Sequence, residues 1–162
     1  LYPENRPNTR NTYVLYTQGV RYFENTDSSA EISYRYFADD DGLRGHTYEL
    51  NWLKRIGEKM VIQPNGRLYF QDAANYYLTT LDGSSFLPSV QPNGTGPFYS
   101  ADYRLSELRT SSFGIKFTYF QKENLSFDLA FDKYHMRGTD GVTSQLVYPD
   151  ANVFTIGFQW QL

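Results

Sequence analysis

Hydrophobic and polar residues alternate one by one along several segments of this chain. Between Leu125 and Asp132 the sequence reads Leu-Ser-Phe-Asp-Leu-Ala-Phe-Asp, so that every second side chain is apolar. This period of two is typical of extended strands with one apolar and one polar face, and no segment shows a convincing helical period. The pattern predicts an all-β chain with seven strands, at residues 11–23, 29–38, 45–56, 59–77, 111–120, 125–137 and 152–162.

The connections between these strands differ in length. Residues 24–29, 57–59 and 121–124 are short and polar, as tight turns are. Residues 78–110 and 138–151 are long and rich in Gly, Pro, Ser and Asp, which predicts two long surface loops. The chain, 1–162, is therefore interpreted as a single domain or part of one.

The segment Pro64-Asn65-Gly66 inside the fourth strand leaves two interpretations open. Asn-Gly is a strong hairpin signal, which would divide this segment into two strands and raise the total to eight. We favour one long strand that carries the proline at a bulge, because bulges are among the few places where a strand tolerates proline.

Alternating strands of about ten residues, joined by short turns at one end and long loops at the other, are typical of transmembrane β-barrels. In such a barrel the polar face lines the lumen, where charged side chains form ion pairs across strands or set solute selectivity. The predicted lumen-facing residues are Glu31, Arg35, Glu49, Arg67, Lys116, Asp128 and Asp132.

Aromatic side chains are concentrated on the apolar face. The 162 residues include 15 Tyr, 12 Phe and 2 Trp. Membrane barrels carry girdles of aromatic residues at both membrane interfaces, and several of these side chains lie near strand ends. The residues assigned to the apolar face as interfacial aromatics are Tyr34, Tyr36, Trp52, Tyr119, Phe120 and Trp160.

Composition excludes several other classes of protein. No run approaches the roughly 18 apolar residues of a membrane helix, and the absence of cysteine excludes disulfide scaffolds and thiolate metal sites. A net charge of −3 argues against a nucleic-acid partner. A soluble β-domain that binds carbohydrate remains the alternative fold-level interpretation.

The direction of the strands adds a prediction about completeness. If the last strand ends on the periplasmic side, the first strand begins outside the cell. Because bacterial barrels have an even number of strands, seven strands predict the C-terminal part of a larger barrel. The final Phe-Gln-Trp-Gln-Leu resembles the closing strand that the barrel-assembly machinery recognises.

Candidate chemistry is sparse. Asp39, Asp40 and Asp41 precede a glycine and are weak candidates for a calcium site, with a solvated acidic turn as the alternative. No metal site is assigned, and no catalytic residue or cofactor is predicted. The aromatic residues of the long loop could stack on sugars or proteins, or pack on the rim of the barrel: Tyr76, Tyr77, Phe86, Phe98, Tyr99 and Tyr103.

Several ordered segments carry a family resemblance, among them Ser33-Tyr34-Arg35-Tyr36-Phe37-Ala38-Asp39-Asp40-Asp41-Gly42, Gly45-His46-Thr47 and Tyr99-Ser100-Ala101-Asp102-Tyr103-Arg104-Leu105-Ser106. From about residue 29 onward the chain resembles the C-terminal half of a family of uncharacterised Gram-negative outer-membrane proteins. The resemblance implies a location in the bacterial outer membrane and brings no activity with it.

We therefore expect an outer-membrane barrel that acts as a scaffold or accessory subunit of a cell-envelope complex, with lipid around it and a protein partner at its surface loops. The alternative is a channel or transporter for a small solute or an exported chain. An enzyme is not expected.

Overall fold

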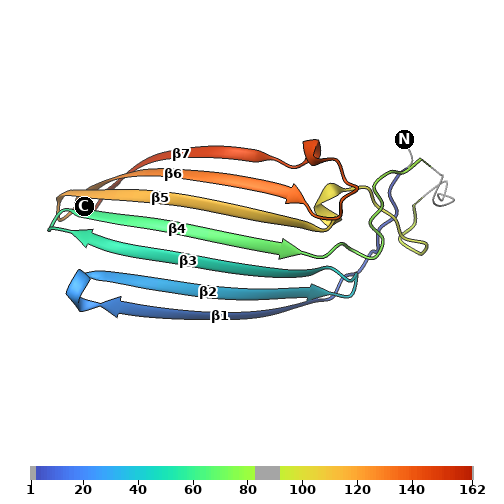
Figure 1. The fold of residues 1–162 in the computed structure, drawn as a ribbon, viewed down its shortest axis with the longest axis horizontal. Coiled ribbons are helices and arrows are strands. Elements are labelled where there is room, and N and C mark those ends of the chain that lie inside the picture. Colours follow the sequence, from blue (N-terminus) through green and yellow to red (C-terminus); the bar gives the residue numbers. More distant parts are fainter. Residues whose placement is uncertain (1–2, 83–91, 162) are drawn as a thin grey trace.

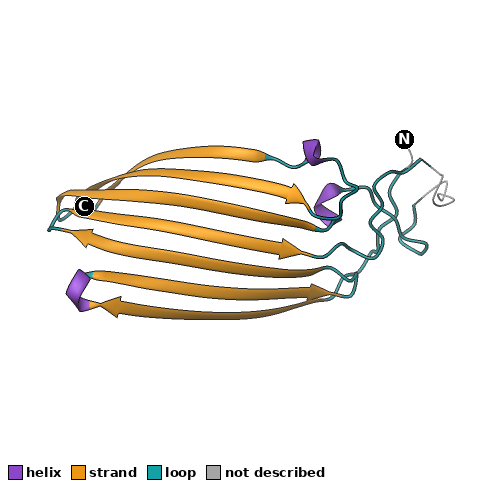
Figure 2. Ribbon diagram, viewed as in Figure 1, coloured by secondary structure: helices purple, strands orange, loops and turns teal. Residues whose placement is uncertain are grey.

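In the computed structural model, which describes residues 3–82 and 92–161, seven strands form one antiparallel sheet in sequence order (Figure 1). They are β1 (Thr12–Phe23), β2 (Ser28–Asp39), β3 (Arg44–Ile56), β4 (Met60–Gln71), β5 (Leu108–Lys122), β6 (Leu125–Gly138) and β7 (Asp150–Trp160). Only short 3-10 turns accompany them: η1 (Glu24–Thr26), η2 (Tyr103–Leu105) and η3 (Gln145–Val147) (Figure 2). The all-β fold with seven antiparallel strands is confirmed.

The two long connections lie at one end of the sheet, together with the short β2–β3 connection at residues 40–43. The turns after β1, β3 and β5 gather at the end where the chain terminates, and the long connections gather at the other end with the N-terminal segment (Figure 1). We call these the turn end and the loop end. No helix in the described part of the chain is long and apolar enough to span a membrane.

Strand β4 is continuous through Pro64, so the eight-strand interpretation is wrong. Pro64 pairs in register with Ile115 of β5, whereas the ladder to β3 is interrupted between the pairs Asn51–Asn65 and Lys54–Ile62. Proline has no N–H to donate, which accounts for a gap on one side only. The expected bulge is also absent, because the register to β3 is the same on both sides of the gap.

The structure and the prediction also differ in where β4 ends. The strand stops at Gln71 instead of residue 77, and the following residues join the loops. Hydrogen bonds from Ala74 N to Leu105 O (2.8 Å) and from Asn75 N to Asp41 O (2.8 Å) hold them there. These bonds connect distant parts of the sequence, so alternation within the segment could not reveal them.

The sheet exposes its apolar face. On β6 the side chains from Phe127 to Lys133 alternate strictly between exposed apolar or basic residues and half-buried polar or small ones. Leu129 is 51% exposed and Ile156, directly opposite on β7, is 84% exposed. This is the reverse of a water-soluble protein, in which the apolar face of a sheet is the buried one.

The sheet is open. Strands β1 and β7 each pair with one neighbour, and nearly all of their residues are exposed. Closure into a barrel, which the pattern predicts, is therefore not present within these seven strands.

Candidate functional site

The charged face of the sheet collects all seven polar residues that the sequence assigns to a lumen. Strand register places Glu31, Asn51 and Asn65 in one cross-strand row and Glu49 and Arg67 in the next. All seven lie on this one side of the sheet: Glu31, Arg35, Glu49, Arg67, Lys116, Asp128 and Asp132.

Two of the expected ion pairs are present on this charged face. Arg67 Nε lies 3.2 Å from Glu49 Oε1, and Lys116 Nζ lies 3.1 Å from Asp128 Oδ1. The hydroxyl of Thr118 also donates to Asp128, at 2.6 Å. Each pair joins neighbouring strands, so these charges stabilise strand pairing.

The remaining charged residues have different surroundings. Asn51 Nδ2 donates weakly to Glu31 at 3.5 Å. The Asp132 carboxylate lies across Gly114, where an added Cβ would come within 1.9 Å of its oxygen. Arg35 makes no ion pair with a described residue and lies over the Phe37 ring at 5.9 Å. Glycine at position 114 therefore gives Asp132 room to lie flat on the sheet.

The apolar face holds five of the six predicted interfacial aromatics. Tyr34 packs against Tyr48 with ring centroids 5.1 Å apart, and Tyr34 donates to or accepts from His46 Nδ1 at 2.8 Å. Tyr36, Trp52, Tyr119 and Trp160 lie on the same face. Phe120 was assigned to this face wrongly, because it follows Tyr119 directly and alternation turns it to the charged face.

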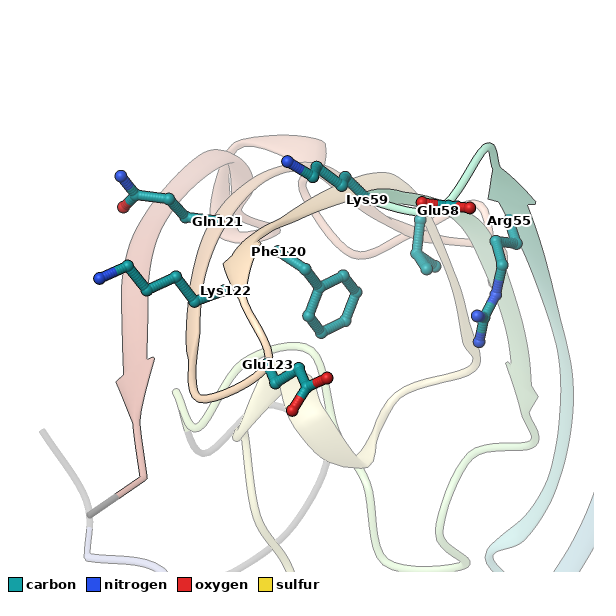
Figure 3. A pocket seen from close by; sticks show the side chains of 8 residues that line it. Arg55, Glu58, Lys59, Phe120, Gln121, Lys122 and Glu123 are labelled. Carbon is teal, nitrogen blue, oxygen red and sulfur yellow. The ribbon is translucent and has the colours of Figure 1, made fainter.

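Phe120 contributes to a pocket at the turn end of the charged face, with a volume of about 530 Å³. Figure 3 shows its ring among the charged side chains of the β3–β4 and β5–β6 turns. The lining residues are Arg55, Glu58, Lys59, Val61, Phe120, Gln121, Lys122 and Glu123. Both signs of charge are present, so the pocket has no clear preference for an anion or a cation.

The loop end contains the most deeply buried side chains among the described residues. Tyr99 and Asn5 are each 1% exposed, and their backbones form a two-way hydrogen-bonded bridge. The Asn5 side chain donates to Thr95 O at 2.7 Å and Pro97 O at 3.0 Å, and it accepts from Gly94 N at 3.1 Å. One buried amide thus ties the N-terminal segment to the long loop.

A second set of contacts joins the two long loops and the charged face. Ser106, fully buried, shares a 2.6 Å hydrogen bond with the hydroxyl of Tyr148. Gln71 donates to the carbonyls of Arg104 at 2.8 Å and Ser106 at 2.9 Å. We call the described loop residues 3–11, 40–43, 72–82, 92–107 and 139–149 the loop cluster.

Among the loop aromatics, Tyr99 is buried and Tyr103 packs edge-on against Tyr148 at 5.5 Å. Tyr76 packs edge-on against Phe98 at 6.5 Å, and the Tyr77 hydroxyl bonds to Thr143 at 2.7 Å. Packing on the rim therefore accounts for most of these aromatic rings. Phe86 lies outside the described residues.

The acidic triplet connects chain segments. Asp39 pairs with Arg10, while Asp40 accepts from the backbone N–H of Asn11 at 3.1 Å. Burial, together with the neighbouring carboxylates of Asp39 and Asp40, raises the pKa of Asp41 above its usual range. No group of three or more ligands that could hold a metal occurs in the described ranges, and the triplet is engaged with the N-terminal segment.

Asp102 is the other strongly held carboxylate of the loop cluster. Arg104 donates to it from Nε at 2.9 Å and from its terminal nitrogen at 2.6 Å, and Arg6 adds a bond at 3.1 Å. Hydrogen bonding to Arg104 is the main cause that lowers the pKa of Asp102 to about 2. The Asp102 carboxylate therefore has a structural role, because it holds Arg104 and Arg6 in place.

Sequence reasoning missed Asn5, Gln71 and Tyr148, because their roles depend on partners far away in the chain. It also missed the basic side chains at the loop end of the apolar face, Arg109, Lys133, His135 and Arg137. The period of two contained a signal for the last three, since they continue the outward series of Phe127, Leu129 and Phe131.

Comparison with known proteins gives one match. No curated protein and no solved structure matches the chain. A family model described as "Protein of unknown function (DUF3570)" matches residues 1–162. The chain therefore belongs to the family of proteins of unknown function DUF3570.

Proposed function

We propose that this chain is part of a β-barrel of the bacterial outer membrane, with the apolar face toward lipid and the charged face toward the lumen. The observation that carries the proposal is the inverted polarity of the sheet. Large apolar side chains on the apolar face are widely exposed, as at Ile156 (84%) and Phe158 (75%), while ion pairs occupy the opposite face. When the surroundings are lipid, exposing such an apolar face carries no free-energy cost.

Strand length supports the same proposal. The strands contain between 11 and 15 residues. At ~3.4 Å per residue they extend about 37–51 Å, and a tilt of about 45° leaves about 26–36 Å across the bilayer. That height brackets the ~30 Å hydrocarbon core.

The open edges indicate what the barrel needs to close. β1 has Arg21 as its one charged residue and β7 has Asp150, so neither edge carries the lysines, prolines or bulges that protect a free edge. β1 and β7 run in the same direction, because six antiparallel pairings separate them. An all-antiparallel barrel therefore requires an odd number of further strands between β7 and β1.

A scaffold or accessory role is favoured by the loop cluster. It has its own buried side chains, and Gln71 bonds it to the loop end of the charged face. A fixed platform of this kind suits contact with a partner of the cell envelope. The C-terminal strand would serve recognition by the barrel-assembly machinery.

A channel is the second candidate. It is favoured by the accessibility of the charged face, where the Arg67 and Lys116 side chains remain 52% and 43% exposed. Planar-bilayer conductance separates the two roles. A scaffold predicts no conductance, whereas a channel predicts conductance whose ion selectivity changes in Lys116→Glu and stays unchanged in Lys54→Gln on the apolar face.

The membrane proposal itself is tested by gel mobility of the detergent-extracted protein before and after boiling, with intact mass on the same sample. A folded barrel migrates differently until it is boiled. Full solubility in buffer without detergent, with no heat-dependent shift, would refute the proposal and favour the soluble β-domain.

A further inference from the structure

Charge is sorted between the two faces of the sheet. Nearly all acidic residues of the strands lie on the charged face: Glu31, Asp39, Glu49, Asp128 and Asp132. The apolar face has Asp150 as its one acidic strand residue, and Asp150 is paired with His135 at 2.5 Å. Cations on the apolar face therefore have almost no acidic partner within the sheet.

Three of these cations, Arg109, Arg137 and Lys133, gather at the loop end of β5 and β6 together with His135. Arg109 and Arg137 lie directly opposite each other in the strand register, and His135 and Lys133 follow on the same face. Directly opposed like charges destabilise a strand pair, because their Cβ atoms lie only about 5 Å apart. Neither guanidinium makes an ion pair with a described residue, so this repulsion has no compensation within the described chain.

An apolar hollow of about 290 Å³ adjoins Arg109, whose partner in the strand register is Arg137. Its apolar walls are Leu68, Phe70 and Phe113, and Ser111 lies between them where a large side chain would fill the space. Arg109 and His135 border the same hollow. The site thus combines a cationic edge with an apolar slot on the face that we assign to lipid.

We infer that this site binds an anionic lipid with a terminal phosphate, with the phosphate between Arg109 and Arg137 and an acyl chain along Leu68, Phe70 and Phe113. The inference rests on the proposed membrane location. Paired guanidinium groups hold phosphate oxygens by charge-assisted hydrogen bonds, which removes the repulsion between them. The site lies where the apolar surface gives way to the loop end, which is the level of lipid headgroups. Lys133 adds positive charge beside it.

Native mass spectrometry of the detergent-folded protein tests the inference, with dilauroyl phosphatidic acid and dilauroyl phosphatidylcholine as probes. We expect at least tenfold tighter binding of phosphatidic acid by the wild-type protein. R109Q/R137Q removes this preference. The matched control R21Q/R44Q, which replaces two other arginines on the same face, retains it.

A second variant tests the contribution of the lipid's acyl chain separately from that of its phosphate. Ser111→Phe fills the hollow without changing charge, so it should weaken binding of phosphatidic acid. Inorganic phosphate at the same concentration should not displace the lipid. Efficient displacement by phosphate, or equal binding of both lipids by a protein that shows the heat-dependent gel shift, would overturn the lipid site alone. Loss of the gel shift in the wild type would instead overturn the membrane proposal.

Discussion

Leu129→Arg provides a quantitative test of which solvent meets the apolar face. Leu129 lies on β6, opposite Ile156 of β7 and Phe117 of β5. It is 51% exposed, so an arginine there meets the surroundings of the sheet instead of a packed core. In water such a surface substitution changes stability by about 0.5 kcal/mol or less. In hydrocarbon, arginine near the bilayer midplane costs about 2–4 kcal/mol.

That difference is large enough to measure. A cost of 2–4 kcal/mol reduces the folding equilibrium constant by about 30- to 700-fold, since each 1.4 kcal/mol is a factor of ten. Thr155→Arg is the matched control, because Thr155 directly precedes Ile156 and projects to the charged face. There the new arginine lies diagonally from Asp128 and Asp132, so we expect a change below about 0.5 kcal/mol.

Urea-driven unfolding from phosphatidylcholine vesicles measures both variants. Trp52 and Trp160 lie on the apolar face, so their fluorescence reports its transfer between lipid and water. The expected result is a large loss of stability for Leu129→Arg with little change for Thr155→Arg. Equal stabilities of the two variants would refute the assignment of this face to lipid.

Three further predictions concern the loop cluster. Asn5→Ala removes three side-chain hydrogen bonds from a buried site and should cost about 2–3 kcal/mol, measured as faster amide hydrogen exchange at residues 92–107 with unchanged exchange in β6. Tyr148→Phe leaves Ser106 with one fewer partner and should cost about 1 kcal/mol, so equal proteolysis of wild type and variant at the long loop would contradict it. Because the pKa of Asp102 is lowered to about 2, its stabilising contribution is complete above its unfolded value of 3.8 and is lost as pH falls toward 2. Arg104→Gln should move this loss of stability to higher pH. An acid transition that is unchanged when measured by near-ultraviolet circular dichroism would contradict the stabilising role of the Asp102–Arg104 pair.

Much of the sheet could be predicted from the sequence because alternation is a local property. A period of two assigns each side chain to a face without knowledge of its neighbours, and this placed all seven charged residues together. The assignment of Phe120 to the apolar face was wrong because it departed from this alternation. Strand number and the difference between short and long connections also followed from local pattern and turn composition.

The tertiary structure decided what depends on partners distant in the chain. Pro64 stays within a central strand because only the β3 side loses a ladder bond, which the local Asn-Gly signal could not indicate. The buried side chains of the loop cluster, such as Asn5 and Tyr99, are fixed by contacts across more than ninety residues. The opposition of Arg109 and Arg137 arises from strand register alone. Alternation determines on which face of the sheet a residue lies. Register and loop packing determine which side chains it contacts, and both depend on the whole sheet.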